Sequence, residues 1–364
     1  MKTVVIVGAG PAGSYSAYLL AKKGFDVEVY EEHAEIGLPF QCTGILTSYL
    51  EEFVDPKPVL KEKLDVFHVS TWEEEVDVKV DKPNLVLCRT SFDQYLAELA
   101  KKEGAKFFLQ HRYVDNDEKV VRIKDKVSKK ILEKKFDYLI GADGPNSTVS
   151  KVNNFKGTRK FWVGAQARVK MKHKNQVEVY PHIGVFAWVV PESKDIARVG
   201  LYAKSKVHKL FEDFLEKRGC KEIIDHQGGL IPEYNPDIQT EKGNIFLVGD
   251  AALQVKATTG GGIIPGLKAA VCLAEAISEG KSYEKLWRKR MGLDLWLHLK
   301  IHKTLEAMEK KDWNRLLRYM KSKRAQKVIA EHDREYPSRF LLKMIFAEPR
   351  LLLFSRFFFS GMFK

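Results

Sequence analysis

Two kinds of hydrophobic pattern alternate along this chain. Continuous apolar runs that end in glycine occur at residues 3–8 (TVVIVG), 138–141 (YLIG) and 245–249 (IFLVG). Uninterrupted runs of this kind are typical of parallel strands that are buried on both faces. A helical pattern follows the first run at 14–24, and a second short strand follows at 26–31 (DVEVYE). The pattern therefore predicts an α/β domain built on a parallel sheet.

Alternating apolar and polar positions mark a different region of the chain. Residues 64–80 (LDVFHVSTWEEEVDVKV) alternate like the two arms of a hairpin, and residues 161–203 contain further strand-like segments rich in valine and aromatic residues. Period-two patterning of this composition is typical of antiparallel strands. These segments predict a second domain, inserted as an antiparallel sheet into the first.

Positive charge is concentrated in the last quarter of the chain. The 364 residues carry a formal net charge of +13, and residues 281–364 alone hold 21 Lys and Arg against 9 Asp and Glu. This region also becomes rich in leucine and phenylalanine toward its end. It is interpreted in three ways: a solvated helical face, a surface for an anionic membrane, or a surface for an acidic partner protein. Nucleic acid is not an expected partner, because no base-reading module accompanies the basic region.

The remaining composition bears on the cellular setting. The four cysteines are scattered, so neither a disulfide framework nor a metal site is expected. The chain opens on an apolar strand rather than a signal peptide, and no run of about 18 apolar residues predicts a membrane-spanning helix. We expect a cytoplasmic protein, and the basic terminal region leaves open a peripheral contact at the inner face of the cell membrane.

The first glycine-rich segment has the features of a dinucleotide site. Gly8, Gly10 and Gly13 have G-x-G-x-x-G spacing, with Ala12 inside the motif, directly between a predicted strand and a predicted helix. Such glycines allow a tight turn, close approach of a pyrophosphate and close helix–strand contact. Glu31 ends the second strand, where an acid can hold the ribose hydroxyls. An acid at this position favours FAD or NAD over NADP.

Two later motifs distinguish between these cofactors. Arg89 precedes a predicted helix that begins near Ser91, Asp143 follows the second apolar run in an A-D-G sequence, and Gly249-Asp250 ends the third run. The three strand-terminal motifs in this order resemble the flavoprotein hydroxylase and reductase superfamily related to p-hydroxybenzoate hydroxylase. The resemblance implies that FAD is the cofactor, that Asp250 holds a ribityl hydroxyl, and that Arg89 supports the phosphate or ribityl region.

The same resemblance gives a role to the glycine-rich segment after Asp250. It implies that the flavin ring lies against the backbone at Gly261, Gly262 and Ile263, where a helix begins. The positive end of that helix would stabilise negative charge on the reduced flavin. Only one pyrophosphate fingerprint is present, so electrons are expected from transiently bound NAD(P)H or from a protein carrier such as ferredoxin.

Within the predicted sheet, residues 181–191 (PHIGVFAWVVP) resemble a variant of the Y-x-W-x-F-P motif of the geranylgeranyl reductase family. Phe186 replaces the tyrosine, Trp188 is kept, and Val190 replaces the phenylalanine. The further segments that fit this family are PFQCTGIL (39–46), QGGLIP (227–232) and TTGGGI (258–263). An ordinary buried strand is the alternative interpretation of the 181–191 segment.

This second resemblance implies an FAD-dependent reduction of C=C double bonds in the geranylgeranyl-type chains of membrane lipids. Phe186 and Trp188 are the expected substrate-binding residues, while Cys42 and Gly44 are expected beside the flavin. Cys42 is also a candidate proton donor. The alternatives are an aromatic monooxygenase, a reductase of prenyl-quinone tails, and a non-catalytic flavin- or lipid-binding protein.

The predicted architecture is thus an α/β fold with three parts. A discontinuous Rossmann-type FAD-binding domain is expected at 1–63, 88–155 and 235–285. The antiparallel-sheet substrate domain is expected at 64–87 and 156–234, followed by a helical, basic C-terminal region at 286–364.

Overall fold

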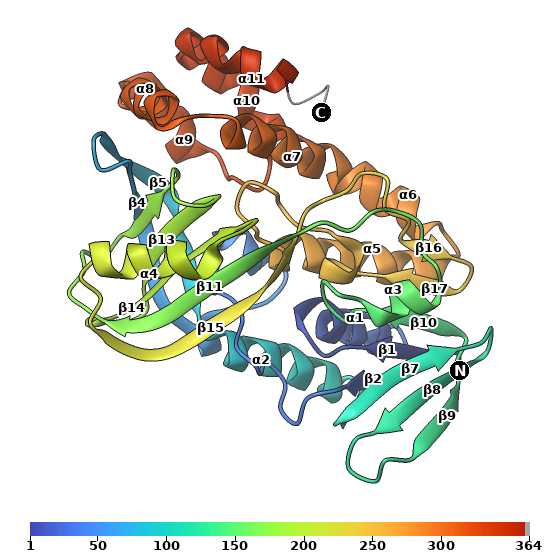
Figure 1. Ribbon diagram of the computed structural model, residues 1–364. Helices are drawn as coiled ribbons and strands as arrows, with labels where there is room; N and C mark the ends of the chain where they lie inside the picture. The colour runs from blue at the N-terminus through green and yellow to red at the C-terminus, as the bar shows by residue number, and fades with distance from the viewer. Residues whose placement is uncertain (361–364) are drawn as a thin grey trace. The chain divides into compact units, whose positions relative to one another are not determined.

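The computed structural model describes residues 1–360, so the last four residues of the predicted C-terminal region, 361–364, lie outside the described residues. The chain divides into two compact units, drawn together in Figure 1. The first unit comprises residues 1–40, 89–160 and 232–295, and the second comprises 41–88, 161–231 and 296–364. Residues 41–63, assigned to the FAD-binding domain from the sequence, group with the second unit. They do so because the strands at 45–46 and 60–70 pair with the strand at 75–87.

The first unit contains a six-stranded sheet in the order β16-β17-β10-β1-β2-β6. From β17 to β6 all neighbouring strands are parallel, and β16 is antiparallel to β17. A separate three-stranded sheet has the order β7-β8-β9. The strands are β1 (Thr3–Val7), β2 (Asp26–Glu31), β6 (Lys106–Leu109), β7 (His111–Asn116), β8 (Val120–Asp125), β9 (Ile131–Lys135), β10 (Tyr138–Gly141), β16 (Glu241–Lys242) and β17 (Ile245–Leu247).

The helices of this unit follow its strands as expected for a Rossmann-type fold. They are α1 (Pro11–Lys22), α2 (Arg89–Lys102), α3 (Thr148–Val152), α5 (Ile263–Glu279) and α6 (Tyr283–Trp287). The first helix begins earlier than the pattern at 14–24 predicted, because Pro11 occupies its first turn, where a missing N–H costs nothing. Helices α1 and α5 contact each other (Figure 1).

The second unit contains an eight-stranded sheet in the order β15-β11-β14-β13-β12-β4-β5-β3. Its strands are β3 (Ile45–Leu46), β4 (Leu60–Ser70), β5 (Glu75–Leu87), β11 (Phe161–Lys170), β12 (Val177–Tyr180), β13 (Phe186–Pro191), β14 (Ile196–Ala203) and β15 (Glu222–Pro232). The predicted hairpin is present as β4 and β5. The sheet predicted to be antiparallel contains a parallel pairing, because β12 is parallel to β4. The chain reaches β12 only after passing through the first unit, so hairpin geometry does not constrain this pair.

Side chains alternate between the two faces of this sheet. One face packs on α4 (Val207–Lys217), and its core includes Ala167, Val189 and Val199 together with Phe211 and Phe214 of the helix. Helix α4 lies along β13, β14 and β11 in Figure 1. The opposite face therefore carries the even-numbered residues of β11, β13 and β14.

The C-terminal region is helical, as predicted. It contains α7 (Leu293–Glu306), α8 (Lys310–Met320), α9 (Lys323–Glu331), α10 (Pro337–Ala347), a 3₁₀ segment (Pro349–Phe354) and α11 (Ser355–Ser360). Helices α8 and α9 contact β5. Ion pairs at the β4–β5 turn hold α8, with Glu74 2.9–3.0 Å from Arg318 and Lys321. Within residues 1–360, no helix combines the length and apolarity needed to cross a membrane.

Candidate functional site

The three predicted cofactor motifs meet in the first unit. They follow β1, β10 and β17, which are parallel neighbours whose carboxyl ends share one edge of the sheet. The first motif packs closely against the second: a β-carbon added at Gly8 would lie 2.4 Å from the carbonyl oxygen of Ala142. One added at Gly249 would lie 2.8 Å from Cβ of Ala12, which links the third motif to the first.

The first motif forms an open cradle at the start of α1. A β-carbon at Gly13 would lie 2.1 Å from the Gly8 carbonyl oxygen, so only glycine permits this contact between helix and strand. At Gly10, apart from its neighbours along the chain, no atom of the described residues lies within 4 Å of such a carbon, which leaves the backbone accessible to a ligand. The buried Glu31 carboxylate accepts a hydrogen bond from the N–H of Ala9 at 2.8 Å, which fixes the acid beside the cradle.

The third motif places a partly buried carboxyl group against the start of α5. The nearest Asp250 carboxylate oxygen would lie 2.4 Å from a β-carbon at Gly262, the residue before Ile263. Burial raises the pKa of Asp250 to about 6, and the positive charge of Arg89 opposes that rise. Arg89 also makes a bidentate ion pair with Asp93 at 2.9 and 3.0 Å. Arg89 is the first residue of α2 rather than a residue ahead of the helix.

Asp143 of the second motif caps α3 in the structure. Its carboxylate accepts hydrogen bonds from the Ser147 hydroxyl at 2.6 Å and from the N–H groups of Thr148 and Val149 at 2.7 and 3.0 Å. Carboxylates at helix N-termini satisfy unpaired backbone donors in this way. The structure thus shows what Asp143 does for the protein, and its cofactor contact stays a prediction.

Arg159 is a residue of this site that sequence reasoning missed. Its guanidinium donates to the carbonyl oxygen of Pro145 at 3.2 Å, to the Ser150 hydroxyl at 3.0 Å, and to the carbonyl oxygen of Ala251. It therefore ties the loop after the second motif to the turn after Asp250. No motif surrounds Arg159 in the sequence, so only its position in the fold identifies this role.

These features fit FAD. The bare backbone at Gly10 and the N-terminus of α1 suit a pyrophosphate, and Glu31 lies where a ribose hydroxyl pair would need an acceptor. Asp250 can accept from a ribityl hydroxyl. The N-terminus of the 17-residue helix α5 follows directly after the paired glycines, where a flavin ring would meet positive partial charge.

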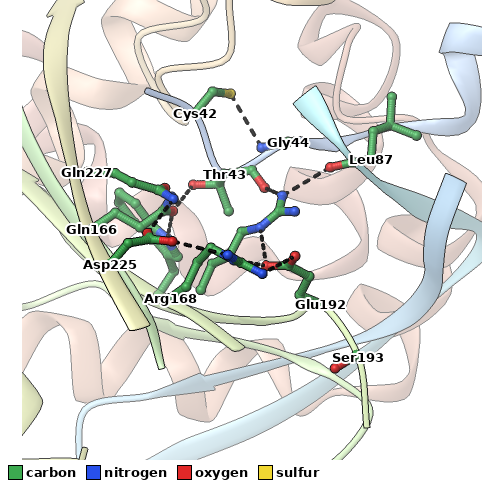
Figure 2. A network of polar contacts seen from close by, with 12 residues as sticks. Cys42, Thr43, Gly44, Leu87, Gln166, Arg168, Glu192, Ser193, Asp225 and Gln227 are labelled. Atoms are coloured by element: carbon green, nitrogen blue, oxygen red, sulfur yellow. Dashed lines mark hydrogen bonds and ion pairs between the residues drawn. The ribbon is translucent and has the colours of Figure 1, made fainter. Parts of the chain in front are cut away.

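The predicted residues Cys42 and Gly44 lie in the second unit, on the loop before β3. The N–H of Gly44 donates to the Cys42 sulfur at 3.4 Å, as Figure 2 shows. Between them, Thr43 is held twice: its hydroxyl donates to Oε1 of Gln166 at 2.8 Å, and its carbonyl oxygen accepts from Arg198. Arg198 is buried and also donates to the Leu87 carbonyl oxygen at 3.1 Å.

A closed polar network behind this loop keeps it in place (Figure 2). Gln166 donates to Gln227 at 2.5 Å, and Gln227 donates to Asp225 at 2.8 Å. Arg168 bridges Asp225 and Glu192, with N–O distances of 2.9 to 3.1 Å. Glu192 accepts from the Arg198 guanidinium at 3.1 Å, which completes the circuit. Networks in which each member is satisfied make a single geometry favourable.

The predicted substrate residues join the same network. The indole N–H of Trp188 donates to Oε1 of Gln166 at 3.0 Å. The Phe186 ring lies 5.6 Å from the Trp188 ring and 5.0 Å from the Tyr202 ring, centroid to centroid. A β-carbon at Gly200 would come within 2.5 Å of the Trp188 ring, so this glycine makes room for the indole. Hydrogen bonds through Gln166 therefore connect the aromatic cluster to the Cys42 loop within the second unit.

Comparison with known proteins agrees with this description. A model of the FAD binding domain family matches residues 1–210. A digeranylgeranylglycerophospholipid reductase of Methanothrix thermoacetophila is 28% identical over 89% of this chain and 93% of its own. The enzyme of the same name from Methanocaldococcus jannaschii is 29% identical over 84% of this chain and 87% of its own. A geranylgeranyl bacteriochlorophyll reductase-like structure from Thermoplasma acidophilum matches with a TM-score of 0.81, over 97% of this chain and 100% of its own, at 20% identity.

The fold and the cradle define an FAD-dependent oxidoreductase, and FAD is its cofactor. The chain belongs to the FAD-binding domain family, whose model covers more than half of its length. The predicted α/β fold class and the resemblance to the geranylgeranyl reductase family are both confirmed.

Proposed function

We propose that this protein reduces C=C double bonds in geranylgeranyl-type chains of membrane lipids. The observation that carries the proposal is the hydrogen-bond path from Trp188 through Gln166 to Thr43. It joins the aromatic residues expected to meet an isoprenoid chain to the loop that holds the expected acid, Cys42. The digeranylgeranylglycerophospholipid reductases that resemble this chain over most of its length support the same substrate class.

The aromatic cluster suits a hydrocarbon chain. Trp188 is 9% exposed and Phe186 is partly buried, and both project from the sheet face opposite α4. Their rings offer a large apolar area with few rotatable bonds. The indole N–H is already bonded to Gln166, so Trp188 presents no unsatisfied donor to the substrate. An alkene held on such a surface is shielded from water while charge develops on its carbons.

The reaction adds one hydride and one proton across each double bond. Bound in its reduced form, FAD supplies the hydride. We assign the proton to the Cys42 thiol, which gives it to the second alkene carbon and recovers a proton from solvent. The Gly44 N–H, 3.4 Å from the sulfur, would strengthen its hydrogen bond as the thiolate forms. The electron donor, NAD(P)H or a ferredoxin, stays a prediction.

We also propose that the lipid is reached by peripheral contact with an anionic membrane. Among the terminal residues whose burial the structure describes, four apolar side chains are exposed: Leu342 (67%), Phe346 (80%), Leu352 (55%) and Leu353 (55%). The neighbouring helix α9 adds exposed Lys323 and Arg324. Apolar side chains bordered by basic residues bind at the interface of anionic bilayers.

The test is a single-turnover reduction without oxygen. The bound flavin is reduced with dithionite, a geranylgeranylated glycerolipid is added, and reoxidation of the flavin is followed together with the mass of the lipid. A gain of two hydrogens per double bond supports the proposal. Reduced flavin that reoxidises only when oxygen is admitted would contradict it. Substituting a prenylquinone or a phenol for the lipid separates the quinone-tail reductase and the monooxygenase from the proposed enzyme.

The role of Cys42 has its own test in the same assay. Cys42→Ser should keep FAD and lose most of the lipid reduction, because a hydroxyl is a much weaker acid than a thiol. Cys220→Ser, a partly buried cysteine packed against the α4 core, is the matched control and should react normally. Full turnover by Cys42→Ser would show that Cys42 is not the proton donor. It would not contradict the proposed reductase activity.

A further inference from the structure

A buried lysine lies in the loop that precedes α5. Lys256 is 5% exposed, and lysine side chains are rarely buried this deeply. No motif singled out in the sequence includes it, since the TTGGGI segment begins two residues later. It lies on the loop that is expected to hold the flavin ring.

The loop folds back on itself so that the side chain of Lys256 lies next to Gly261. The N–H of Lys256 donates to the Gly261 carbonyl oxygen at 3.2 Å, and its own carbonyl oxygen accepts from Thr259 and Gly260 at 3.1 and 2.9 Å. A β-carbon at Gly261 would lie 3.0 Å from Cε and 3.5 Å from Nζ of Lys256. The side chain therefore runs along the loop and brings its ammonium group to the backbone of Gly261.

Two sources of positive potential meet at this point. The backbone N–H groups at the start of α5 follow directly after Gly262, and a helix N-terminus carries about half a positive charge. The Lys256 side chain reaches Gly261, the residue before Gly262, and its ammonium adds positive potential in a buried loop where solvent screens charge weakly. A flavin ring that rests on Gly261 and Gly262 would experience both.

We infer that Lys256 tunes the bound flavin, making it easier to reduce by stabilising the negative charge that the ring gains. This inference requires only that FAD binds at the glycine-rich loop, and it is independent of which substrate is reduced. Asp250 and Lys256 then have different roles in this loop. The Asp250 carboxylate lies next to Gly262 and binds a ribityl hydroxyl, whereas the Lys256 side chain lies next to Gly261 and sets the electrostatic potential at the flavin ring.

The test uses sulfite, which adds to oxidised flavin, bleaches its visible absorbance and leaves negative charge on the ring. The FAD-loaded Lys256→Met variant should bind sulfite with a dissociation constant roughly tenfold higher than the unmodified protein. A tenfold change corresponds to a reduction potential lower by about 30 mV for a two-electron couple, which redox-dye titration measures separately. Lys256→Arg keeps the charge and should stay near the original value.

The matched control is Lys281→Met. Lys281 lies just beyond the other end of α5, is about half exposed and pairs with Glu279 at 2.5 Å. Its loss should change neither sulfite affinity nor potential. Unchanged sulfite affinity in FAD-loaded Lys256→Met would overturn the inference. If Lys256→Met and Lys256→Gln both fail to retain FAD, the residue holds the cofactor or the fold instead, which also overturns it. Either result leaves the lipid-reduction test unaffected.

Discussion

The indole N–H of Trp188 donates a hydrogen bond to the side-chain oxygen of Gln166, and the hydroxyl of Thr43 donates to that same oxygen. One amide oxygen thus accepts from the strand that carries the aromatic cluster and from the loop that carries Cys42. Trp188 therefore has two functions in this proposal. Its ring offers apolar surface to the substrate, and its N–H fixes the amide that positions the loop.

Trp188→Phe separates these functions, because it keeps an aromatic ring and removes the donor. We expect a loss of about 1–3 kcal/mol in the free energy of unfolding, since a buried hydrogen bond is broken. Lipid reduction should slow, while FAD content stays normal. Denaturant titration and the single-turnover assay measure both effects. Trp296→Phe is the control, because that partly exposed ring stacks under Lys300 at 5.4 Å and should tolerate the change. Equal rates in the two variants would contradict the positioning role.

Gly200→Ala tests the same relationship from the neighbouring strand. The new β-carbon would lie 2.5 Å from the Trp188 ring and 2.9 Å from the Ala165 backbone oxygen, so the indole must move. Overpacking of this kind costs about 1–3 kcal/mol. Gly292→Ala is the matched control: outside its own helix backbone, the described residues offer its β-carbon a contact with Cβ of Arg288 at an ordinary 3.6 Å, and alanine favours helix. Denaturant unfolding curves should show Gly200→Ala to be less stable than Gly292→Ala. An unchanged free energy of unfolding in Gly200→Ala would show that the indole tolerates displacement.

The first cofactor motif could be predicted from the sequence almost to the residue. The strand at 26–31 matches β2 at both ends, and the glycines at 8, 10 and 13 occupy the cradle as expected. Strand, turn, helix and acid follow one another within about 30 residues, so local preferences determine them. The position of Asp250 at the end of a strand could also be predicted, because an apolar run leads directly into it.

The polar network around Gln166 could not be predicted. Alternation within β11 places Gln166 and Arg168 on one face of a strand, yet it does not reveal what faces them. Thr43, the partner of Gln166, is 123 residues away, and Arg198 reaches the same loop from another strand. Such partners are fixed by strand order and register, neither of which is encoded in a short segment. The parallel pairing of β12 with β4 was missed for this reason too.

Asp250 should make the stability of the FAD-free protein depend on pH. Its pKa is raised to about 6 by burial, above the ordinary value of 3.8, so the folded state keeps a proton that the unfolded state releases. Stability is therefore lost as the pH rises from about 4 to 6. Asp250→Asn lacks this loss and should be more stable than the unmodified protein at pH 8, by on the order of 2–3 kcal/mol. The two should be equally stable near pH 3.5.

The same carboxyl group should control FAD binding in the opposite sense. An ionised Asp250 accepts a hydroxyl hydrogen bond more strongly, so FAD affinity should fall as the pH is lowered through 6. Fluorescence titration of the flavin at several pH values measures this, and Asp250→Asn should show weaker, pH-independent binding. Asp237→Asn, at an exposed position of the same unit, is the control. An unchanged pH profile in Asp250→Asn would assign the titration to another group.

The terminal apolar side chains should determine membrane binding more than the net charge of the region suggests. Arg350 and Arg356 pair with Glu348 and Asp312 at 2.5–2.9 Å, so part of the positive charge is already compensated within the protein. Leu342 and Phe346 are one helical turn apart on α10 and therefore lie on the same side of it. Their insertion into a bilayer would bury apolar area that now faces water.

Replacing both Leu342 and Phe346 by serine should weaken binding to anionic phospholipid vesicles at least tenfold, because each lost side chain removes roughly 1.5–3 kcal/mol of burial. Leu293→Ser is the matched control, since Leu293 is similarly exposed at 61% but begins α7. Vesicle sedimentation at low and high salt separates the apolar contribution from the electrostatic one, which fades as salt is added. Equal vesicle binding by the double variant and the unmodified protein would show that another part of the protein makes the membrane contact. If the unmodified protein ignores anionic vesicles at low salt, the proposed membrane contact is wrong and the lipid must reach Trp188 by another route.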